Sequence, residues 1–281
     1  TMTSSSGPGL SLKQECISYM AGCELPVVIV NVMRTGPGLG NISPAQGDYF
    51  QATRGGGHGD YRTIVLAPSC VQDAGDLTYD AFDLADKYRT PVMLLLDGMI
   101  GQMREPFELR EYKQKENYDK SWALTGCKGR QQNIVRSFYM QWSDSQKLSQ
   151  RLVDRYETIQ RNETRAECFL TDDADLIVVA YGTPARMAKS AITKLRGQGV
   201  KVGLFRPITL WPYPEKELQR VAKHASDILV IEWSAGQMIE DVKLSLGNSN
   251  KIHFFGKIGG ALTDADEIEQ KIDEIFIKNG V

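Results

Sequence analysis

The sequence predicts an α/β protein with two domains, each built on a parallel sheet. Apolar runs typical of buried strands alternate with segments of helical periodicity, and this alternation occurs twice, before residue 108 and after residue 173. The strand runs are continuously apolar, as expected when helices cover both faces of a parallel sheet. The predicted domains are therefore residues 1–108 and 173–281, joined by a crossover and connecting helix over residues 109–172.

In the first domain the pattern predicts strands and helices in alternation. The strands are Thr1–Ser4, Val27–Met33, Thr63–Ala67 and Pro91–Asp97. The helices are Gly9–Ala21, a short one at Pro44–Thr53, and Val71–Tyr88. Apolar residues recur at helical spacing in the last of these, and Pro91 blocks its extension.

The connecting region is predicted to contain a crossover and one helix, and the second domain again alternates strands with helices. Glu111–Lys120 is charged and irregular, which predicts a solvated crossover, and Asp144–Glu167 carries the apolar stripe of an amphipathic helix. The second domain is expected to form a small parallel sheet with right-handed crossovers. Its strands are Leu176–Ala180, Lys201–Phe205, Ile228–Glu232 and Lys251–Gly256, and its helices are Pro184–Gln198, Glu215–Ala225, Ala235–Leu246 and Asp264–Lys278.

Composition excludes several classes of function. The net charge of −2, with both signs interspersed over 281 residues, is untypical of a nucleic-acid surface. The chain contains neither an apolar run long enough to span a membrane nor a signal-peptide pattern. Its five cysteines are scattered without a C-x-x-C motif, so the sequence predicts neither an iron–sulfur cluster nor a metal site in this chain. Reduced thiols in a cytoplasmic protein are expected.

Two loops rich in small residues form the candidate ligand site. Ser4–Gly9 follows the first predicted strand and Arg34–Gly40 follows the second, and open α/β sheets bind ligands at the carboxyl ends of their strands. Glycines let backbone N–H groups approach a flat or anionic ligand, and Arg34 can bind a carboxylate with two hydrogen bonds. Two alternatives remain open: a strand-to-helix turn capped by serine, and a structural carboxylate partner for Arg34.

Other loops are assigned to structural roles. Gly36–Gly40 superficially resembles a dinucleotide fingerprint, but its spacing is wrong and it lacks the acidic residue that the motif requires. His58, in a glycine-rich loop, is expected to order that loop rather than to transfer protons. The segments 206–212 and 232–238 could line an anion cleft, but docking between the two domains is the favoured interpretation.

A set of short motifs gives a more specific indication, because it resembles one enzyme family along essentially the whole chain. The motifs are Thr3-Ser4-Ser5-Ser6-Gly7-Pro8-Gly9, Arg34-Thr35-Gly36-Pro37-Gly38, Gln46-Gly47-Asp48, Gly57-His58-Gly59 and Ser121-Trp122-Ala123. With these motifs the sequence resembles the alpha-type subunit of the thiamine-diphosphate-dependent 2-oxoacid:ferredoxin oxidoreductases, and within them the 2-ketoisovalerate (branched-chain) type.

The resemblance implies a fold, cofactors and partners. The first domain would be of the pyrimidine-binding type of thiamine enzymes, and the second similar to the transketolase C-terminal domain. Thiamine diphosphate with Mg²⁺ would be shared with a beta-type, diphosphate-binding subunit, and iron–sulfur clusters would lie in a delta-type partner beside a gamma-type subunit. The implied reaction is oxidative decarboxylation of a 2-oxoacid, such as 2-oxoisovalerate, by coenzyme A and ferredoxin to give acyl-CoA, carbon dioxide and reduced ferredoxin.

The resemblance also assigns site residues. Arg34 matches the arginine that faces the substrate carboxylate, and Ser5, Ser6 and Gly7 match the loop beside the cofactor rings. No catalytic residue is identified in this chain.

The sequence also departs from the family pattern. The substrate loop and the cofactor-activating glutamate of the family's N-terminal part do not appear, and Glu15 and Glu24 are not substitutes for that glutamate. We therefore expect that an N-terminal segment is absent, through cleavage, truncation or a split gene, and that this chain alone is inactive. A non-catalytic assembly or regulatory subunit that retains the fold is the alternative.

Overall fold

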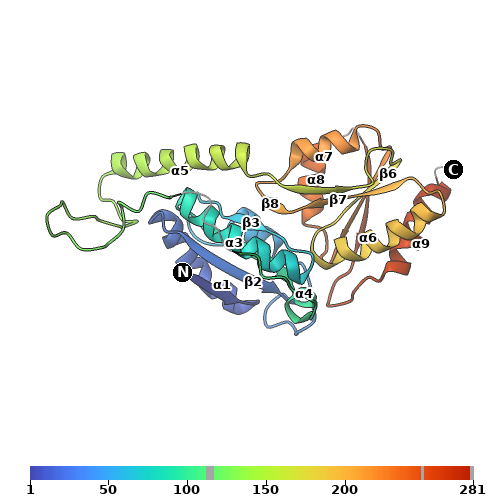
Figure 1. The fold of residues 1–281 in the computed structure, drawn as a ribbon, viewed down its shortest axis with the longest axis horizontal. Helices are drawn as coiled ribbons and strands as arrows, with labels where there is room; N and C mark the ends of the chain where they lie inside the picture. The colour runs from blue at the N-terminus through green and yellow to red at the C-terminus, as the bar shows by residue number, and fades with distance from the viewer. Residues whose placement is uncertain (112–116, 248–249, 279–281) are drawn as a thin grey trace.

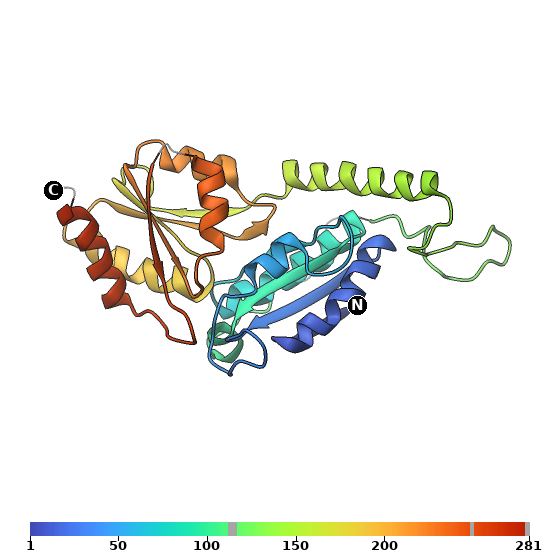
Figure 2. The same ribbon diagram turned by 180° about the vertical axis from the view of Figure 1, so that it is seen from behind.

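Two five-stranded sheets lie side by side along the long axis of the molecule, with the N-terminus at the first and the C-terminus at the far end of the second (Figures 1 and 2). The computed structural model describes residues 1–111, 117–247 and 250–278. The first sheet has the order β1-β2-β4-β3-β8, and the second β10-β9-β6-β7-β5. The expected two-sheet α/β architecture is therefore confirmed.

In the first sheet, four parallel strands and one antiparallel strand are packed between two layers of helices. Leu10, Ile17 and Ala21 of α1 pack on one face with α2, whereas α3 and α5 contribute to the cluster on the other. The strands are β1 (Met2–Ser5), β2 (Val27–Met33), β3 (Ile64–Leu66), β4 (Pro91–Asp97) and β8 (Thr209–Trp211). The helices are α1 (Pro8–Gly22), α2 (Tyr49–Arg54), α3 (Val71–Tyr88), α4 (Gly98–Gln102) and α5 (Trp142–Asn162).

The second sheet has the same layered build. Helices α6 and α9 cover one face, and α7 and α8 cover the other. Its strands are β5 (Ala166–Phe169), β6 (Leu176–Val179), β7 (Val202–Pro207), β9 (Asp227–Glu232) and β10 (Lys251–Gly256). Its helices are α6 (Gly182–Gly197), α7 (Glu215–Ala222), α8 (Met238–Leu246) and α9 (Ala265–Lys278).

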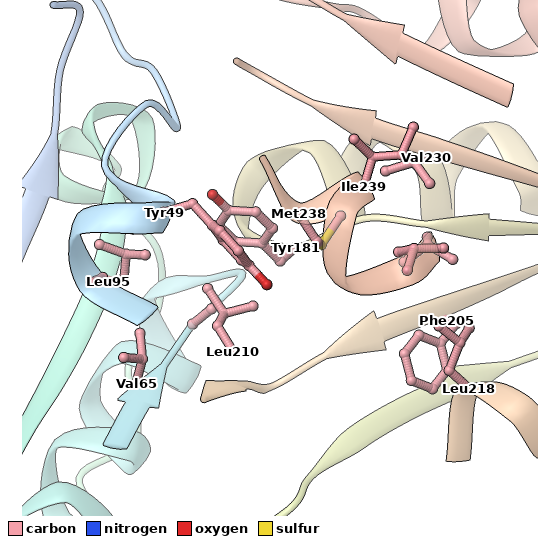
Figure 3. Close-up of a cluster of buried hydrophobic side chains, with 14 of the residues drawn as sticks. Tyr49, Val65, Leu95, Tyr181, Phe205, Leu210, Leu218, Val230, Met238 and Ile239 are labelled. Atoms are coloured by element: carbon pink, nitrogen blue, oxygen red, sulfur yellow. The ribbon is translucent and has the colours of Figure 1, made fainter. Parts of the chain in front are cut away.

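The two sheets share one apolar core. Figure 3 shows Tyr49, Val65 and Leu95 from the first sheet and its helix α2 beside residues of the second. In addition, β8 follows β7 almost directly but pairs antiparallel with β3, so that the chain crosses from the second sheet into the first. The domain boundaries at residues 108 and 172 remain a prediction. In the structure the two sheets and their helices pack against each other through this shared core.

Several predicted elements were wrong in extent or kind. The connecting helix spans Trp142–Asn162 rather than Asp144–Glu167, because Glu163 ends it and its carboxylate accepts hydrogen bonds from Tyr88 and Lys87. The residues after it form β5, which runs antiparallel to β7, so the second sheet is mixed and not purely parallel. Strand β8 and helix α4 were not predicted.

The predicted helix at Pro44–Thr53 is also shorter than expected. Pro44 forms an antiparallel bridge with Arg34, and the backbone N–H of Gln46 donates to the carbonyl of Trp233. Because these residues pair with other parts of the chain, the helix begins only at Tyr49. Of the predicted solvated crossover, residues 112–116 lie outside the described residues.

Candidate functional site

The candidate site lies at the carboxyl ends of two neighbouring strands, β1 and β2. Their parallel register places Ser5 opposite Asn31, so the loops that follow the two strands leave the sheet side by side. The first loop turns at Gly7, with φ of +53°, directly into α1. The second begins with Arg34 and continues through residues 35–41. The sheet thus brings together two segments that are far apart in sequence.

Arg34 is held by its own loop. Its Nη1 donates to the carbonyl oxygens of Leu39, at 2.5 Å, and Asn41, at 3.0 Å. No salt bridge includes Arg34 among the residues that the structure describes. Backbone carbonyls therefore orient the guanidinium while leaving its positive charge available to a ligand.

Gly7 lies directly against this guanidinium. A Cβ atom on Gly7 would lie 2.9 Å from Nε and 3.1 Å from both Cζ and Nη2 of Arg34. Glycine is required here for two reasons, since the backbone is in the left-handed region and no side chain would fit beneath Arg34. The predicted juxtaposition of the arginine with the Ser5–Gly7 turn is the observed geometry.

A hollow of about 570 Å³ opens beside Arg34. Gly7, Pro8, Ser11 and Asp48 contribute to its lining, together with residues 34–39. Pro8, the first residue of the 15-residue helix α1, lines the hollow, so the positive end of the helix dipole lies there. The first turn of α1 carries no acidic residue that would neutralise this positive potential. The guanidinium and the helix N-terminus together favour a bound anion.

Asn31 and Asp48 form a polar pair beside this hollow that sequence reasoning missed. Asn31 is fully buried within β2, near its carboxyl end, and its Nδ2 donates to Asp48 Oδ2 at 3.1 Å. Its own Oδ1 has no hydrogen-bond partner among the residues that the structure describes. Burial raises the pKa of Asp48, against the opposing effects of the Asn31 hydrogen bond and the Arg34 charge. A polar residue within the apolar run of β2 was the available signal.

Of the three predicted cofactor-binding residues, Gly7 lines the hollow and the two serines do not. Gly7 lines the hollow with Arg34. Ser5 turns its hydroxyl toward Gly9 in the first turn of α1, and the Ser6 carbonyl accepts a hydrogen bond from the Gly9 N–H at 3.2 Å. Neither serine is among the residues that line the hollow. Both shape the turn that carries Gly7.

The two second-domain segments serve as docking surfaces, which confirms the favoured interpretation. Buried Gln46 accepts from the Trp233 N–H at 2.9 Å and donates to the Tyr181 carbonyl at 3.0 Å. Gln237 donates to the carbonyl of Gly47 and accepts from the N–H of Phe50.

The carboxylate and the arginine in these segments are satisfied within the protein. Glu232 is fully buried and accepts from four groups at the start of α8, including the N–H of Met238 and of Ile239. Arg206 forms ion pairs with Asp73 at 3.0 Å and Glu167 at 2.7 Å. These segments therefore offer no free charge to a ligand.

Two further residues considered from the sequence lie away from the hollow. Glu24 forms ion pairs with Arg151 and Arg155 of α5, so it links the turn before β2 to the connecting helix. The glycine-rich loop is tied to α1, since the side-chain hydroxyl of Ser18 donates to the backbone carbonyl of His58 at 2.5 Å. The described residues contain no group of three or more His, Cys, Asp or Glu that could hold a metal ion.

Comparison with known families matches nearly the whole chain. Residues 1–161 match the thiamine-diphosphate-binding domain of pyruvate flavodoxin/ferredoxin oxidoreductases, and residues 174–268 match core domain II of pyruvate:ferredoxin oxidoreductase. Among the described helices, none is both long and apolar enough to cross a lipid bilayer.

Individual relatives give a finer comparison. The chain is 47% identical over 274 residues to ketoisovalerate oxidoreductase subunit VorB of Methanothermobacter marburgensis, covering 98% of this chain and 78% of the relative. It is 35% identical to 2-oxoglutarate synthase subunit KorA of the same organism, covering 96% and 79%.

A solved structure gives the same indication. A 2-oxoglutarate:ferredoxin oxidoreductase from Magnetococcus marinus, with 2-oxoglutarate, coenzyme A and succinyl-CoA bound, superimposes with a TM-score of 0.79 at 25% identity. The match covers 97% of this chain and 52% of the Magnetococcus marinus chain, so this chain spans about half the length of that protein. A split-gene transketolase, with a TM-score of 0.54 at 12% identity, shows that the fold is transketolase-like.

Proposed function

Because the chain belongs to the 2-oxoacid:ferredoxin oxidoreductase family, as an alpha-type subunit, we propose that it binds a branched-chain 2-oxoacid, with 2-oxoisovalerate as the first candidate. The reaction would be oxidative decarboxylation to acyl-CoA, carbon dioxide and reduced ferredoxin. The higher identity to the ketoisovalerate subunit than to the 2-oxoglutarate subunit supports this substrate class. The comparisons give no support to a non-catalytic assembly subunit.

The observation that carries the proposal is the position of Arg34. Its guanidinium has only backbone partners among the described residues, abuts Gly7 and lines a hollow beside the N-terminus of α1. A 2-oxoacid has a carboxylate that must be held in a fixed orientation before it leaves as carbon dioxide. A guanidinium can do this with two parallel hydrogen bonds.

The residues present fit the cofactor of this family. Gly7 lines the hollow beside the Arg34 guanidinium, and the Oδ1 of buried Asn31 is an acceptor with no donor among the described residues. Ser5 and Ser6 support the turn that presents Gly7. When bound, thiamine diphosphate supplies the carbon nucleophile and electron sink that decarboxylation needs. The role of this chain would be to cradle the ring end and to orient the substrate carboxylate.

The remaining groups are proposed to come from other subunits. Mg²⁺ needs oxygen ligands, and the described residues contain no group of three or more His, Cys, Asp or Glu that could hold a metal ion. We assign the diphosphate and Mg²⁺ site to a beta-type subunit. Iron–sulfur clusters are assigned to a delta-type subunit, a gamma-type subunit completes the proposed complex, and ferredoxin binds the complex. The proposed complex acts in the cytoplasm.

The test is an assay of the complete complex. The full-length subunit would be co-expressed with its beta-, gamma- and delta-type partners, and ferredoxin reduction would be followed with 2-oxoisovalerate, 2-oxoglutarate and pyruvate. We expect the highest kcat/KM with 2-oxoisovalerate. Higher kcat/KM with 2-oxoglutarate would contradict the proposed substrate, and an assembled complex inactive with every 2-oxoacid would contradict the proposed function.

A further inference from the structure

The loop that follows β2 and Arg34 is closed at its base. The loop comprises residues 35–43, and Figures 1 and 2 show it in blue beyond the carboxyl end of the first sheet. The N–H of Thr35 donates to the carbonyl of Ser43 at 2.9 Å, and the N–H of Asn41 donates to the carbonyl of Thr35 at 3.1 Å. Gly40 lies so close to Thr35 that a Cβ atom on it would be 1.7 Å from the Thr35 carbonyl oxygen. The loop is therefore held in a defined position beside the hollow.

Leu39 contributes to the hollow in two ways. Its carbonyl oxygen accepts a hydrogen bond from Arg34 Nη1 at 2.5 Å, so its backbone orients the guanidinium. The residue also lines the hollow and is 80% exposed, so the described part of the chain leaves its side chain uncovered. Of the described residues that line the hollow, it alone has a large aliphatic side chain. A ligand held by Arg34 therefore lies beside an uncovered isobutyl group.

The charges at the hollow suit a ligand with a single carboxylate. Among the described residues that line it, Arg34 is the only cation and Asp48 the only acid. A second carboxylate, such as that at the far end of 2-oxoglutarate, would find no second cation in this lining and would approach the acidic Asp48. Taking a carboxylate out of water without a partner is costly. The lining favours a substrate whose far end is apolar.

A branched 2-oxoacid carries its apolar group close to its carboxylate, since only the ketone carbon separates the two. Arg34 donates to the Leu39 backbone and is proposed to bind the substrate carboxylate. The branched end of the substrate and the Leu39 side chain therefore lie in the same small region. Contact between them would remove apolar surface of both from water, which favours binding.

We propose that Leu39 is a specificity-determining residue, whose side chain contacts the branched end of the 2-oxoacid while its carbonyl orients Arg34 toward the carboxylate. This inference rests on the proposed function, because it requires that the hollow binds a 2-oxoacid. It assigns the two ends of the substrate to two side chains, the carboxylate to Arg34 and the apolar branch to Leu39.

The test is the substrate selectivity of the complete complex with Leu39→Ala. This substitution keeps the backbone carbonyl to which Arg34 donates, so the carboxylate site is retained. We expect kcat/KM for 2-oxoisovalerate to fall by at least about tenfold, as for other losses of methyl contacts in apolar subsites, and kcat/KM for pyruvate to fall much less. Leu39→Lys should raise kcat/KM for 2-oxoglutarate relative to 2-oxoisovalerate, because it offers a cation to the second carboxylate.

Ile42→Ala is the matched control. Ile42 lies on the same loop and is 86% exposed, but it is not among the residues that line the hollow. Its replacement should leave the ratio of kcat/KM for 2-oxoisovalerate to that for pyruvate unchanged. Because both Leu39 and Ile42 are exposed, both variants are expected to keep the fold, which thermal unfolding would verify.

A binding measurement gives a second readout that does not depend on turnover. 2-Hydroxyisovalerate keeps the carboxylate and the branched end of the substrate but lacks its ketone, and calorimetry would give its Kd for the complex. We expect Leu39→Ala to raise this Kd. The Kd of lactate, which has a single methyl group in place of the branch, should change much less.

The outcomes separate this inference from the proposed function. An active native complex whose selectivity is unchanged by Leu39→Ala would overturn the role of Leu39 alone. Equal falls in kcat/KM for 2-oxoisovalerate and pyruvate would also overturn it, because Leu39 would then act only through Arg34. A native complex that is inactive with every 2-oxoacid would overturn both the role of Leu39 and the proposed function.

Discussion

Two arginines at the ends of strands face very different surroundings. Arg34 follows β2 and Arg206 lies near the end of β7, and each precedes a loop that could have bound an anion. Arg206 is 6% exposed and is paired with Asp73 and Glu167. Among the described residues, Arg34 hydrogen-bonds to backbone carbonyls only, and it opens onto a hollow. The comparison shows that the partner supplied by the tertiary fold, and not the strand-end position, distinguishes a structural cation from one available to a ligand.

The carboxylates near the two arginines also differ, in the direction in which their pKa values are shifted. Burial alone would raise the pKa of Asp73 and of Glu167, but hydrogen bonds and the Arg206 charge hold both pKa values below their usual range. At the hollow, burial prevails and the pKa of Asp48 is raised. The carboxylates beside Arg206 therefore stabilise the fold in their charged form, whereas ionisation of Asp48 opposes folding.

The largest expected effect on stability is that of Arg206→Ala. It would leave the partly buried Asp73 without its cation and Glu167 with Lys189 alone, and breaking such a buried ion pair typically costs about 3–5 kcal/mol. Arg34→Ala removes no ion pair and should lower the free energy of unfolding by less than about 1 kcal/mol. Urea denaturation of both variants measures the difference. Equal losses would contradict the distinction between the two arginines.

Gly7→Ala should have an intermediate effect on stability. The added methyl group would occupy a backbone with positive φ and would contact the Arg34 guanidinium, so we expect a loss of about 1–2 kcal/mol. It should also raise the KM for the 2-oxoacid, because Arg34 must move. Gly199→Ala, at positive φ but with open space around it and away from the hollow, is the matched control and should raise KM much less.

Acid should lower the free energy of unfolding through the two carboxylates that are paired with Arg206. A carboxyl group with a lowered pKa in the folded state stabilises the fold above its unfolded pKa of about 4 and loses this contribution as pH falls through its folded pKa. For Asp73 and Glu167 the free energy of unfolding should therefore fall below about pH 4. Arg206→Ala should flatten this dependence in denaturation measurements over this range. An unchanged slope would show that Arg206 does not set it.

The smallest effect is expected for Asp48→Asn. Because the pKa of Asp48 is raised on folding, its charged form opposes the fold at neutral pH, and the amide should be neutral or slightly stabilising, within about 1 kcal/mol. The comparison variant is Asp73→Asn, which should be destabilising because it removes a partner of Arg206. Thermal unfolding at neutral pH measures both. A clear loss of stability for Asp48→Asn would contradict the proposed asymmetry.

Local sequence patterns predicted most of the fold, since apolar runs such as Pro91–Asp97 and the stripe of Val71–Tyr88 are visible without tertiary information. They missed β8 and β5, because each is short and is defined by its pairing with a strand that is distant in sequence. At the site, Arg34 and Gly7 were predicted from their loops. Asn31 and Asp48 were not, because their pairing is created by the turn between Arg34 and α2.

The central claim is that Arg34 is reserved for the carboxylate of the substrate. Its most direct test is Arg34→Ala in the complete complex, with the KM for 2-oxoisovalerate and the free energy of unfolding measured on the same preparation. The account predicts a rise in KM of at least about tenfold, the value of one charge-assisted hydrogen bond, with stability changed by less than about 1 kcal/mol. An unchanged KM would show that the substrate carboxylate binds elsewhere.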